Sequence, residues 1–199
     1  MHSNPAFRRA DQERNIAAAR SRSFGILSVN GAESPLFSHV PFVLNADGTV
    51  LAAHLTRSNP ILRALSQPTP AAVIVESVSG YISPDWYAME DQVPTYNYVA
   101  VHLRGRLRQL GDDRLRPHLD ALSEVFERRL APKPAWTADK MDDAALARML
   151  RQIVPVEMVV DQVEGTWKLG QNKPDAARIA AAEKASPQAL GDLMRNPPC

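Results

Sequence analysis

The stretch SFGILSVNGAESPLFSHVPFVLNADGTVLAAHL, residues 23–55, decides the fold. It contains three apolar runs of strand length, separated by short breaks rich in Gly, Asn, Asp and Ser. The second break holds Asp47-Gly48, a pair that tolerates the positive φ of a tight hairpin. Because such short connections join antiparallel neighbours, the stretch predicts a β-meander. Its strands are SFGILSV (23–29), LFSHVPFVL (36–44) and TVLAAHL (49–55).

Three further strands are predicted downstream of the meander. AAVIVESV (71–78) is a β-branched run typical of a buried strand. In NYVAVHLRGRLRQL (97–110), Val and Leu alternate with His and Arg, which is the period of a half-buried strand. VPVEMVVDQVEGTWKL (154–169) alternates well enough to close the sheet. Strands clustered at this spacing favour a closed or split antiparallel barrel over a doubly wound parallel sheet.

Helices are predicted around these strands. At residues 58–67, Ser58 or Asn59 can cap a helix whose first turn holds Pro60. The segment at 81–96 is aromatic, broken by proline and predicted to be irregular. Other helices are predicted at residues 6–22, 112–131, 141–153, 173–186 and 187–196.

The length and composition predict one split-barrel domain over residues 1–199. The chain is 45% hydrophobic and 23% charged, as soluble globular domains are. We expect the domain to comprise an N-terminal helix (1–22), a barrel core (23–110), a helical insertion (111–153), a closing strand (154–170) and C-terminal helices (171–199).

The charge and cysteine content point to a cytoplasmic protein. A formal net charge of +1 creates no global field for nucleic acid or membranes, so any anion site must be local. Cys199 is the only cysteine, which excludes an internal disulfide framework and predicts a reducing compartment. The charged N-terminus resembles no secretory signal, and no apolar run approaches the about 20 residues that span a bilayer.

A first candidate site is HLTRSNP (54–60), where a strand runs into a helix start. Backbone N–H groups at a helix N-terminus lack partners and carry partial positive charge. With Arg57, Ser58 and Asn59 they predict a phosphate cradle. The alternative is a capped helix with a surface arginine.

Two other candidate sites follow. Aromatic residues gather in the stretch 81–98 and can stack on a flat ligand, the alternative being a packed loop over the barrel mouth. In WKLGQNKP (167–174), Gln171 and Asn172 can hydrogen-bond a heteroaromatic edge. The alternative there is a helix cap at Asn172. The aromatic residues are Tyr81, Trp86, Tyr87, Tyr96 and Tyr98.

No catalytic or metal site is predicted. His39 and His54 lie on neighbouring strands, but no acids stand at metal-ligand spacing beside them. His118 falls in a charged helix and is expected to be solvated. The chain has no nucleophile elbow, Gly-rich phosphate loop or Cys/His pair.

Taken together, these segments resemble the PaiB-type family of FMN-binding negative transcriptional regulators, part of the split-barrel group with pyridoxamine-phosphate oxidases and flavin reductases. The resemblance extends from about residue 23 to 195 and implies an α+β fold: an FMN-binding split β-barrel, antiparallel and Greek-key-like, with peripheral helices. The stretches that carry it are SFGILSV, SHVPF (38–42), HLTRSNP, YISPDWY (81–87), VPTYNYVAVHLRG (93–105) and KLGQNK (168–173).

The resemblance also implies a homodimer that binds FMN at its interface. Arg57, Ser58 and Asn59 would hold the phosphate, and strand 36–44 would flank the isoalloxazine. Some of the remaining contacts would come from the partner subunit. The residues assigned to the cofactor are His39, Val40, Pro41, His54, Arg57, Ser58, Asn59, Trp86, Thr95, Asn97, Gln171 and Asn172.

Three functions are compatible with these residues. The resemblance favours a transcriptional regulator, although no clear DNA-binding motif occurs and acids interrupt the arginines of residues 8–22. The alternative is an FMN-dependent oxidoreductase or flavin reductase acting on a small substrate or NAD(P)H, because flavin carries the hydride chemistry itself. The third is a partner-binding module that takes no flavin.

Overall fold

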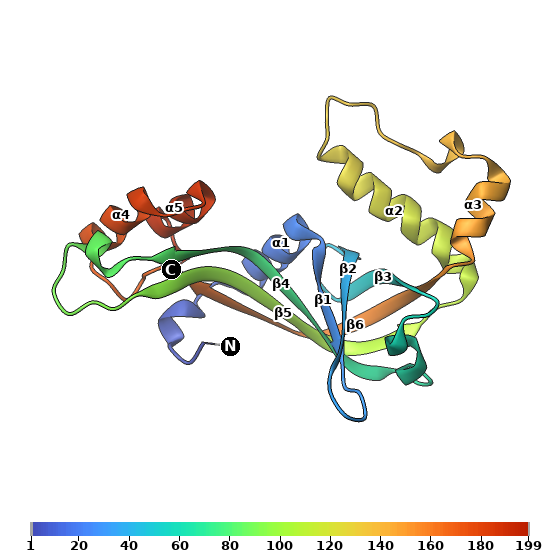
Figure 1. Cartoon of the computed structure of the whole chain (residues 1–199), viewed down its shortest axis with the longest axis horizontal. Helices are drawn as coiled ribbons and strands as arrows, with labels where there is room; N and C mark the ends of the chain where they lie inside the picture. The colour runs from blue at the N-terminus through green and yellow to red at the C-terminus, as the bar shows by residue number, and fades with distance from the viewer. Residues whose placement is uncertain (1, 199) are drawn as a thin grey trace. The chain divides into compact units, whose positions relative to one another are not determined.

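The strands of the chain form a closed barrel in the order β1-β2-β3-β6-β5-β4 (Figure 1). The computed structural model describes residues 2–198. The ladders of β1 with β2 and β4, and of β3 with β2 and β6, are antiparallel. All six predicted strands and the antiparallel barrel are confirmed. The strands are β1 (Phe24–Val29), β2 (Leu36–Leu44), β3 (Val50–Thr56), β4 (Thr69–Ile82), β5 (Thr95–Gln109) and β6 (Ile153–Lys168).

Five α-helices and several 3-10 turns connect these strands. Four predicted helices begin and end within three residues of their expected bounds. They are the helices expected over 112–131, 141–153, 173–186 and 187–196. The α-helices are α1 (Gln12–Arg22), α2 (Leu115–Arg128), α3 (Asp143–Leu150), α4 (Asp175–Lys184) and α5 (Gln188–Arg195). The 3-10 turns are η1 (Pro5–Phe7), η2 (Pro60–Ala64), η3 (Pro84–Tyr87), η4 (Asp112–Arg114) and η5 (Ala138–Lys140).

Two helix predictions were wrong in extent. The helix expected over 6–22 begins only at Gln12, because the side chain of Asp11 accepts a hydrogen bond from the Arg14 amide (2.7 Å) and starts the helix there. The helix expected over 58–67 is only the 3-10 turn η2. The turn ends at Leu65, whose φ of −97° and ψ of 36° are not helical, and Pro68 disfavours helical geometry at the residue before it.

Contacts within the chain divide it into two compact units. The barrel unit comprises residues 23–74 and 103–162, and the terminal unit comprises residues 2–22, 75–102 and 163–198. Strands β4, β5 and β6 each contribute residues to both units.

The core of the barrel unit follows the alternation of its strands. β1 pairs with β2 from Phe24 opposite Pro41 to Val29 opposite Leu36, and every second side chain of β1 is buried. Burying one large apolar side chain contributes about 1.5–3 kcal/mol, so this alternation specifies the register strongly. The largest fully buried side chains of this unit include Leu27, Phe42, Leu51, Leu103, Leu107 and Met158.

The pairing of β3 with β6 positions the end of β3. The ladder runs from Val50 opposite Val159 to Thr56 opposite Ile153. One residue further, the Arg57 amide donates to the Gln152 carbonyl oxygen (2.7 Å). Residues 57 and 152 are therefore held together by main-chain hydrogen bonds, although 94 residues separate them in the sequence.

The terminal unit has its own core, to which α1 is attached by a buried polar contact. Trp167 Nε1 donates to Asn15 Oδ1 (2.7 Å), and the Arg14 guanidinium lies 5.2 Å from the centre of the Trp167 ring. α4 and α5 pack side by side (Figure 1). Other buried residues of this core are Ile82, Tyr87, Val99, Leu169, Ala177, Ala181, Ala182, Leu190 and Met194. Within residues 2–198, no helix is long and apolar enough to cross a bilayer.

Candidate functional site

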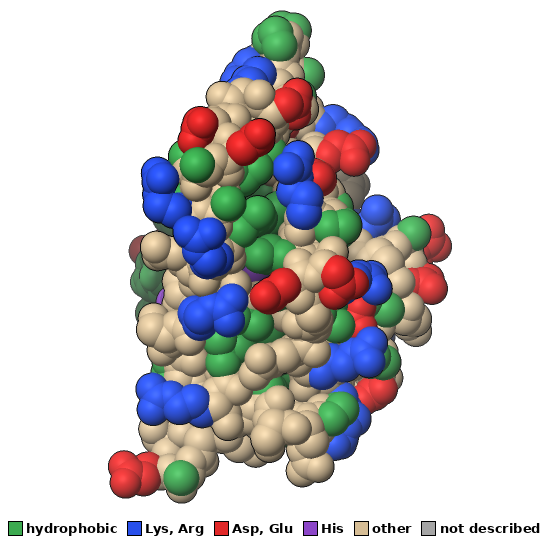
Figure 2. Space-filling view, turned by 90° about the vertical axis from the view of Figure 1, so that its right-hand side faces the viewer, with side chains coloured by type: hydrophobic (Ala, Val, Ile, Leu, Met, Phe, Trp, Pro, Cys, Tyr) green, Lys and Arg blue, Asp and Glu red, His purple; other side chains and the backbone are tan. Residues whose placement is uncertain are grey.

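An arginine-lined pocket lies at the end of β3 in the barrel unit. It has a volume of about 610 Å³ and is lined by Thr56, Arg57, Ser58, Arg148, Arg151 and Gln152. None of these lining residues is acidic, and three of them carry guanidinium groups. Figure 2 views the side of the molecule on which α2 and α3 lie, where Lys and Arg side chains stand among Asp and Glu side chains. The three guanidinium groups that line one pocket create a local anion site in a nearly neutral chain.

Arg57 holds the end of α3 in place as well as lining the pocket. Its Nε donates to the Arg151 carbonyl oxygen (2.9 Å) and its Nη2 to the Ile153 carbonyl oxygen (3.3 Å). Its Nη2 also lies 3.9 Å from a carboxylate oxygen of Asp112, and about half of the side chain is exposed. No side chain of α3 is buried. The position of α3 therefore depends on its ends, and Arg57 fixes the C-terminal one.

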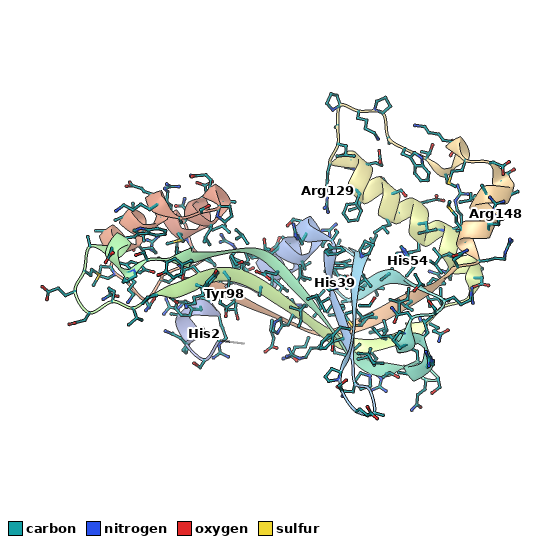
Figure 3. The ribbon with its side chains drawn as sticks, viewed as in Figure 1. His2, His39, His54, Tyr98, Arg129 and Arg148 are labelled. Carbon is teal, nitrogen blue, oxygen red and sulfur yellow. The ribbon has the colours of Figure 1, made fainter. Side chains whose placement is uncertain are left out.

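Arg148 and Arg151 were missed by the sequence analysis, which considered only the apolar face of their helix. Arg148 projects from α3 (Figure 3), and Arg151 follows the last turn of that helix. A spacing of three residues places two side chains on the same face of a helix, which was the available signal. Nothing local connects them with Arg57, because only the pairing of β3 with β6 brings the two segments together.

Ser58 and Asn59 differ in how available their side chains are to a ligand. Ser58 lines the pocket. Asn59 caps η2, since its Oδ1 accepts from the Ile61 amide (3.0 Å), while its Nδ2 donates to Ser38 Oγ (3.1 Å). Both polar atoms of the Asn59 amide are thus engaged within the barrel unit, as the capped-helix alternative expects.

The predicted flavin-flanking residues of β2 divide between the two faces of the barrel wall. His39 is exposed, and its ring stacks on that of Phe24 with centroids 6.3 Å apart and an interplanar angle of 27°. Pro41 is half-buried opposite Phe24. The Val40 side chain lies in the core, 1% exposed, so only its backbone can meet a ligand on the outer face.

His54 of β3, labelled in Figure 3, forms a histidine pair with His118 of α2. His54 Nδ1 lies 3.1 Å from His118 Nε2, and His118 Nδ1 is buried without a hydrogen-bond partner. The expectation that His118 is solvated was wrong. Leu115, His118 and Leu122 occupy one face of α2, and this face packs against the barrel.

Burial lowers the pKa of both rings, and that of His118 falls to about 4, with the neighbouring His54 acting in the same direction. Both rings are therefore neutral at pH 7, and one nitrogen can donate to the other. In the part of the chain that the structure describes, no group of three or more His, Cys, Asp or Glu side chains is arranged for a metal ion.

The remaining five predicted residues belong to the terminal unit. Thr95, Asn97 and Asn172 line a pocket of about 250 Å³ there. The Gln171 side chain folds back on its own strand, donating to the Trp167 carbonyl oxygen (2.6 Å) and accepting from the Leu169 amide (2.8 Å). Trp86 packs against the core of this unit. Asn172 does not cap a helix, since Pro174 occupies the N-cap position of α4.

The barrel architecture places the chain in the split-barrel fold class. The flavocytochrome Anf3 from Azotobacter vinelandii superposes with a TM-score of 0.58 at 14% identity, over 84% of this chain and 72% of that one. The FAD and heme binding protein from Mycobacterium smegmatis gives 0.56 at 22% identity, over 79% and 71%. At these identities the similarity concerns the fold alone.

Residues 1–162 match the family described as "Putative FMN-binding domain", and the chain belongs to this family. It is 30% identical over 167 residues to "Protease synthase and sporulation protein PAI 2" of Bacillus subtilis, covering 83% of this chain and 79% of that protein. The resemblance to the PaiB type and the split-barrel fold are thereby confirmed, and FMN is the cofactor of the family.

We expect the stability of the chain to fall in mild acid because of the histidine pair. The unfolded chain protonates His118 near its ordinary pKa of 6.5, whereas the folded chain does so only near 4. The stabilisation is therefore complete above pH 6.5 and is lost as the pH falls toward 4. Urea unfolding at pH 7.5 and 4.5 should show a loss of about 2 kcal/mol from this group.

His118→Leu supplies the comparison, because it should remove this part of the pH dependence. The exposed His39→Gln should retain it. If the free energy of unfolding of His118→Leu still fell by the same amount between pH 7.5 and pH 4.5, the pair would not titrate in this way.

Proposed function

We propose that the chain is a homodimeric FMN-binding protein of the PaiB type that takes part in negative control of transcription. The observation that carries the proposal is the pocket of Arg57, Arg148 and Arg151, whose lining contains no acid. A phosphate monoester carries nearly two negative charges at neutral pH and presents several acceptor oxygens. The donor set of the pocket fits this group.

The three arginines differ in their proposed parts. Arg57 has two of its nitrogens occupied by carbonyl oxygens, so it mainly positions the end of α3. Arg148 and Arg151 lie on that helix and at its end, both exposed to solvent. A guanidinium can bind a phosphate through two parallel hydrogen bonds. We therefore assign the phosphate to these two side chains, with the Ser58 hydroxyl beside them.

The outer face of β1 and β2 is the proposed support for the flavin ring. His39 and Phe24 form a flat, exposed aromatic surface, and Pro41 lies opposite Phe24 in the ladder. Isoalloxazine is a flat ring system suited to such a surface. When bound, the flavin supplies electron and hydride transfer at its N5 position. The assignment of Trp86, Thr95, Asn97, Gln171 and Asn172 to the flavin stays a prediction.

Exposed apolar side chains support the proposed homodimer. Phe24, Phe37 and Val159 of the barrel unit are 41%, 59% and 45% exposed. Exposed apolar surface on a soluble domain is covered when it forms a protein interface. Two copies of the chain could cover such surfaces symmetrically.

The regulatory role rests on the relationship to PAI 2. That protein is named for protease synthesis and sporulation, and the identity of 30% extends over most of both chains. With a net charge of +1, binding to DNA would depend on local basic groups.

The phosphate assignment predicts that Arg148→Ala and Arg151→Ala each weaken FMN binding by about 1.5–3 kcal/mol, the worth of a charge-assisted hydrogen bond. Quenching of flavin fluorescence on titration measures the affinity. Arg116→Ala is the matched control, since this arginine lies on α2 of the same unit and pairs with Asp120 instead. FMN affinity that is unchanged in both pocket variants would contradict the assignment.

The homodimer predicts a sedimenting species of twice the 21.9 kDa chain mass. If FMN binds at the interface, added FMN should strengthen the dimer, because a ligand stabilises the state that binds it. Analytical ultracentrifugation across a dilution series, with and without FMN, makes the measurement. A monomer that binds FMN stoichiometrically would refute the dimeric site.

Direct repression predicts a specific gel shift with DNA from the chain's own promoter. The affinity should fall as salt rises, because each phosphate contact releases counterions. A scrambled DNA of equal length and composition is the control. The lack of a specific shift at moderate salt would count against direct binding to DNA.

A further inference from the structure

The pocket of the terminal unit carries positive charge that no carboxylate balances. Lys168 at the end of β6 and Lys173 before α4 both line it, and no acidic residue does. Neither lysine has a carboxylate within 4.0 Å among residues 2–198. The lining of the pocket thus contains two ammonium groups and no carboxylate.

Neutral groups hold both ammonium groups. Lys168 Nζ donates to Thr95 Oγ1, and Lys173 Nζ donates to Gln92 Oε1. Lys173 Nζ also lies 5.6 Å from the centre of the Tyr87 ring. Hydrogen bonds to a hydroxyl and an amide, together with an aromatic face, orient the two cations without neutralising them.

This arrangement has an energetic cost that a bound anion would offset. Burial lowers the pKa of Lys168, which means that its charged form is disfavoured in the folded chain. An anion between the lysines would favour the charged form of each. Unbalanced charge in a partly apolar pocket is therefore more typical of a binding site than of a stably packed region.

We propose that this pocket binds a small oxyanion, a carboxylate or a phosphate group, on Lys168 and Lys173. Its volume of about 250 Å³ is below the roughly 300–1,000 Å³ of pockets for larger ligands. Phe7 and Val93 line the same pocket and provide room for a short apolar portion. The ligand is thus a small organic acid or phosphate ester.

The proposal goes beyond the FMN function and reassigns three predicted residues. Thr95, Asn97 and Asn172 were assigned to the flavin by resemblance, but here they line a pocket whose size and charge suit a smaller anion. Asn97 is 1% exposed, its Nδ2 lies 3.5 Å from the weak acceptor Met194 Sδ, and its side chain also hydrogen-bonds Tyr87, another residue of the pocket lining. Thr95 orients Lys168.

The test titrates the FMN-loaded full-length chain with inorganic phosphate and, separately, with acetate. Loading with FMN keeps the arginine pocket filled, and chloride holds the ionic strength constant. Isothermal titration calorimetry should detect one of the two anions, which identifies phosphate or carboxylate as the preferred group. Lys168→Met and Lys173→Gln should each weaken that binding at least tenfold. Lys184→Gln, an exposed lysine of α4, should change it less than twofold.

Two results would overturn the proposal. One is an anion affinity that both pocket variants leave unchanged. The other is release of FMN by the anion, followed by flavin absorbance after gel filtration, that Lys168→Met and Lys173→Gln abolish, which would assign the lysine pocket to the cofactor. If the chain binds no FMN, the same titrations are carried out on the Arg148→Ala/Arg151→Ala variant. They still measure how far anion affinity depends on Lys168 and Lys173. The FMN proposal and the anion proposal can therefore fail separately.

Discussion

The antiparallel pairing of β3 with β6 is the constraint on which the proposed cofactor site depends. Main-chain hydrogen bonds along this ladder place residue 57 beside residue 152. The Arg57 side chain then reaches the carbonyl oxygens at the end of α3 and the start of β6. Because α3 buries no side chain of its own, its arginines would have no defined place without this junction. A barrel ladder thus arranges the charges of a surface pocket.

Positive charge is handled differently in the two units. In the barrel unit, the guanidinium groups stand at an open pocket where water screens them, and one also serves as a structural donor. In the terminal unit, two ammonium groups share a smaller pocket with neutral partners. In both cases the lining lacks carboxylates, so an anion is the ligand that each pocket favours. The larger pocket is the proposed site for the phosphate of a nucleotide, and the smaller pocket is the proposed site for a small acid.

The histidine pair shows how a polar group can belong to the packing of a fold. His118 occupies a position on the apolar face of α2, where a leucine would be expected, and it meets His54 of β3. Two neutral imidazoles can share one proton in a hydrogen bond, whereas two protonated rings repel each other in a buried place. Protonation of the buried rings weakens this contact, which makes the packing of α2 on the barrel sensitive to acid, although Leu115 and Leu122 pack on the same face.

The amino-acid sequence by itself determined the strands, the hairpin at Asp47-Gly48 and the antiparallel barrel, because alternation and turn chemistry are local properties. It also located Arg57 and Ser58 at the pocket. Only the tertiary structure decided that Arg148 and Arg151 join them and that His118 is buried against His54. These contacts join segments that lie far apart in the sequence, and no local pattern encodes which segments the barrel brings together.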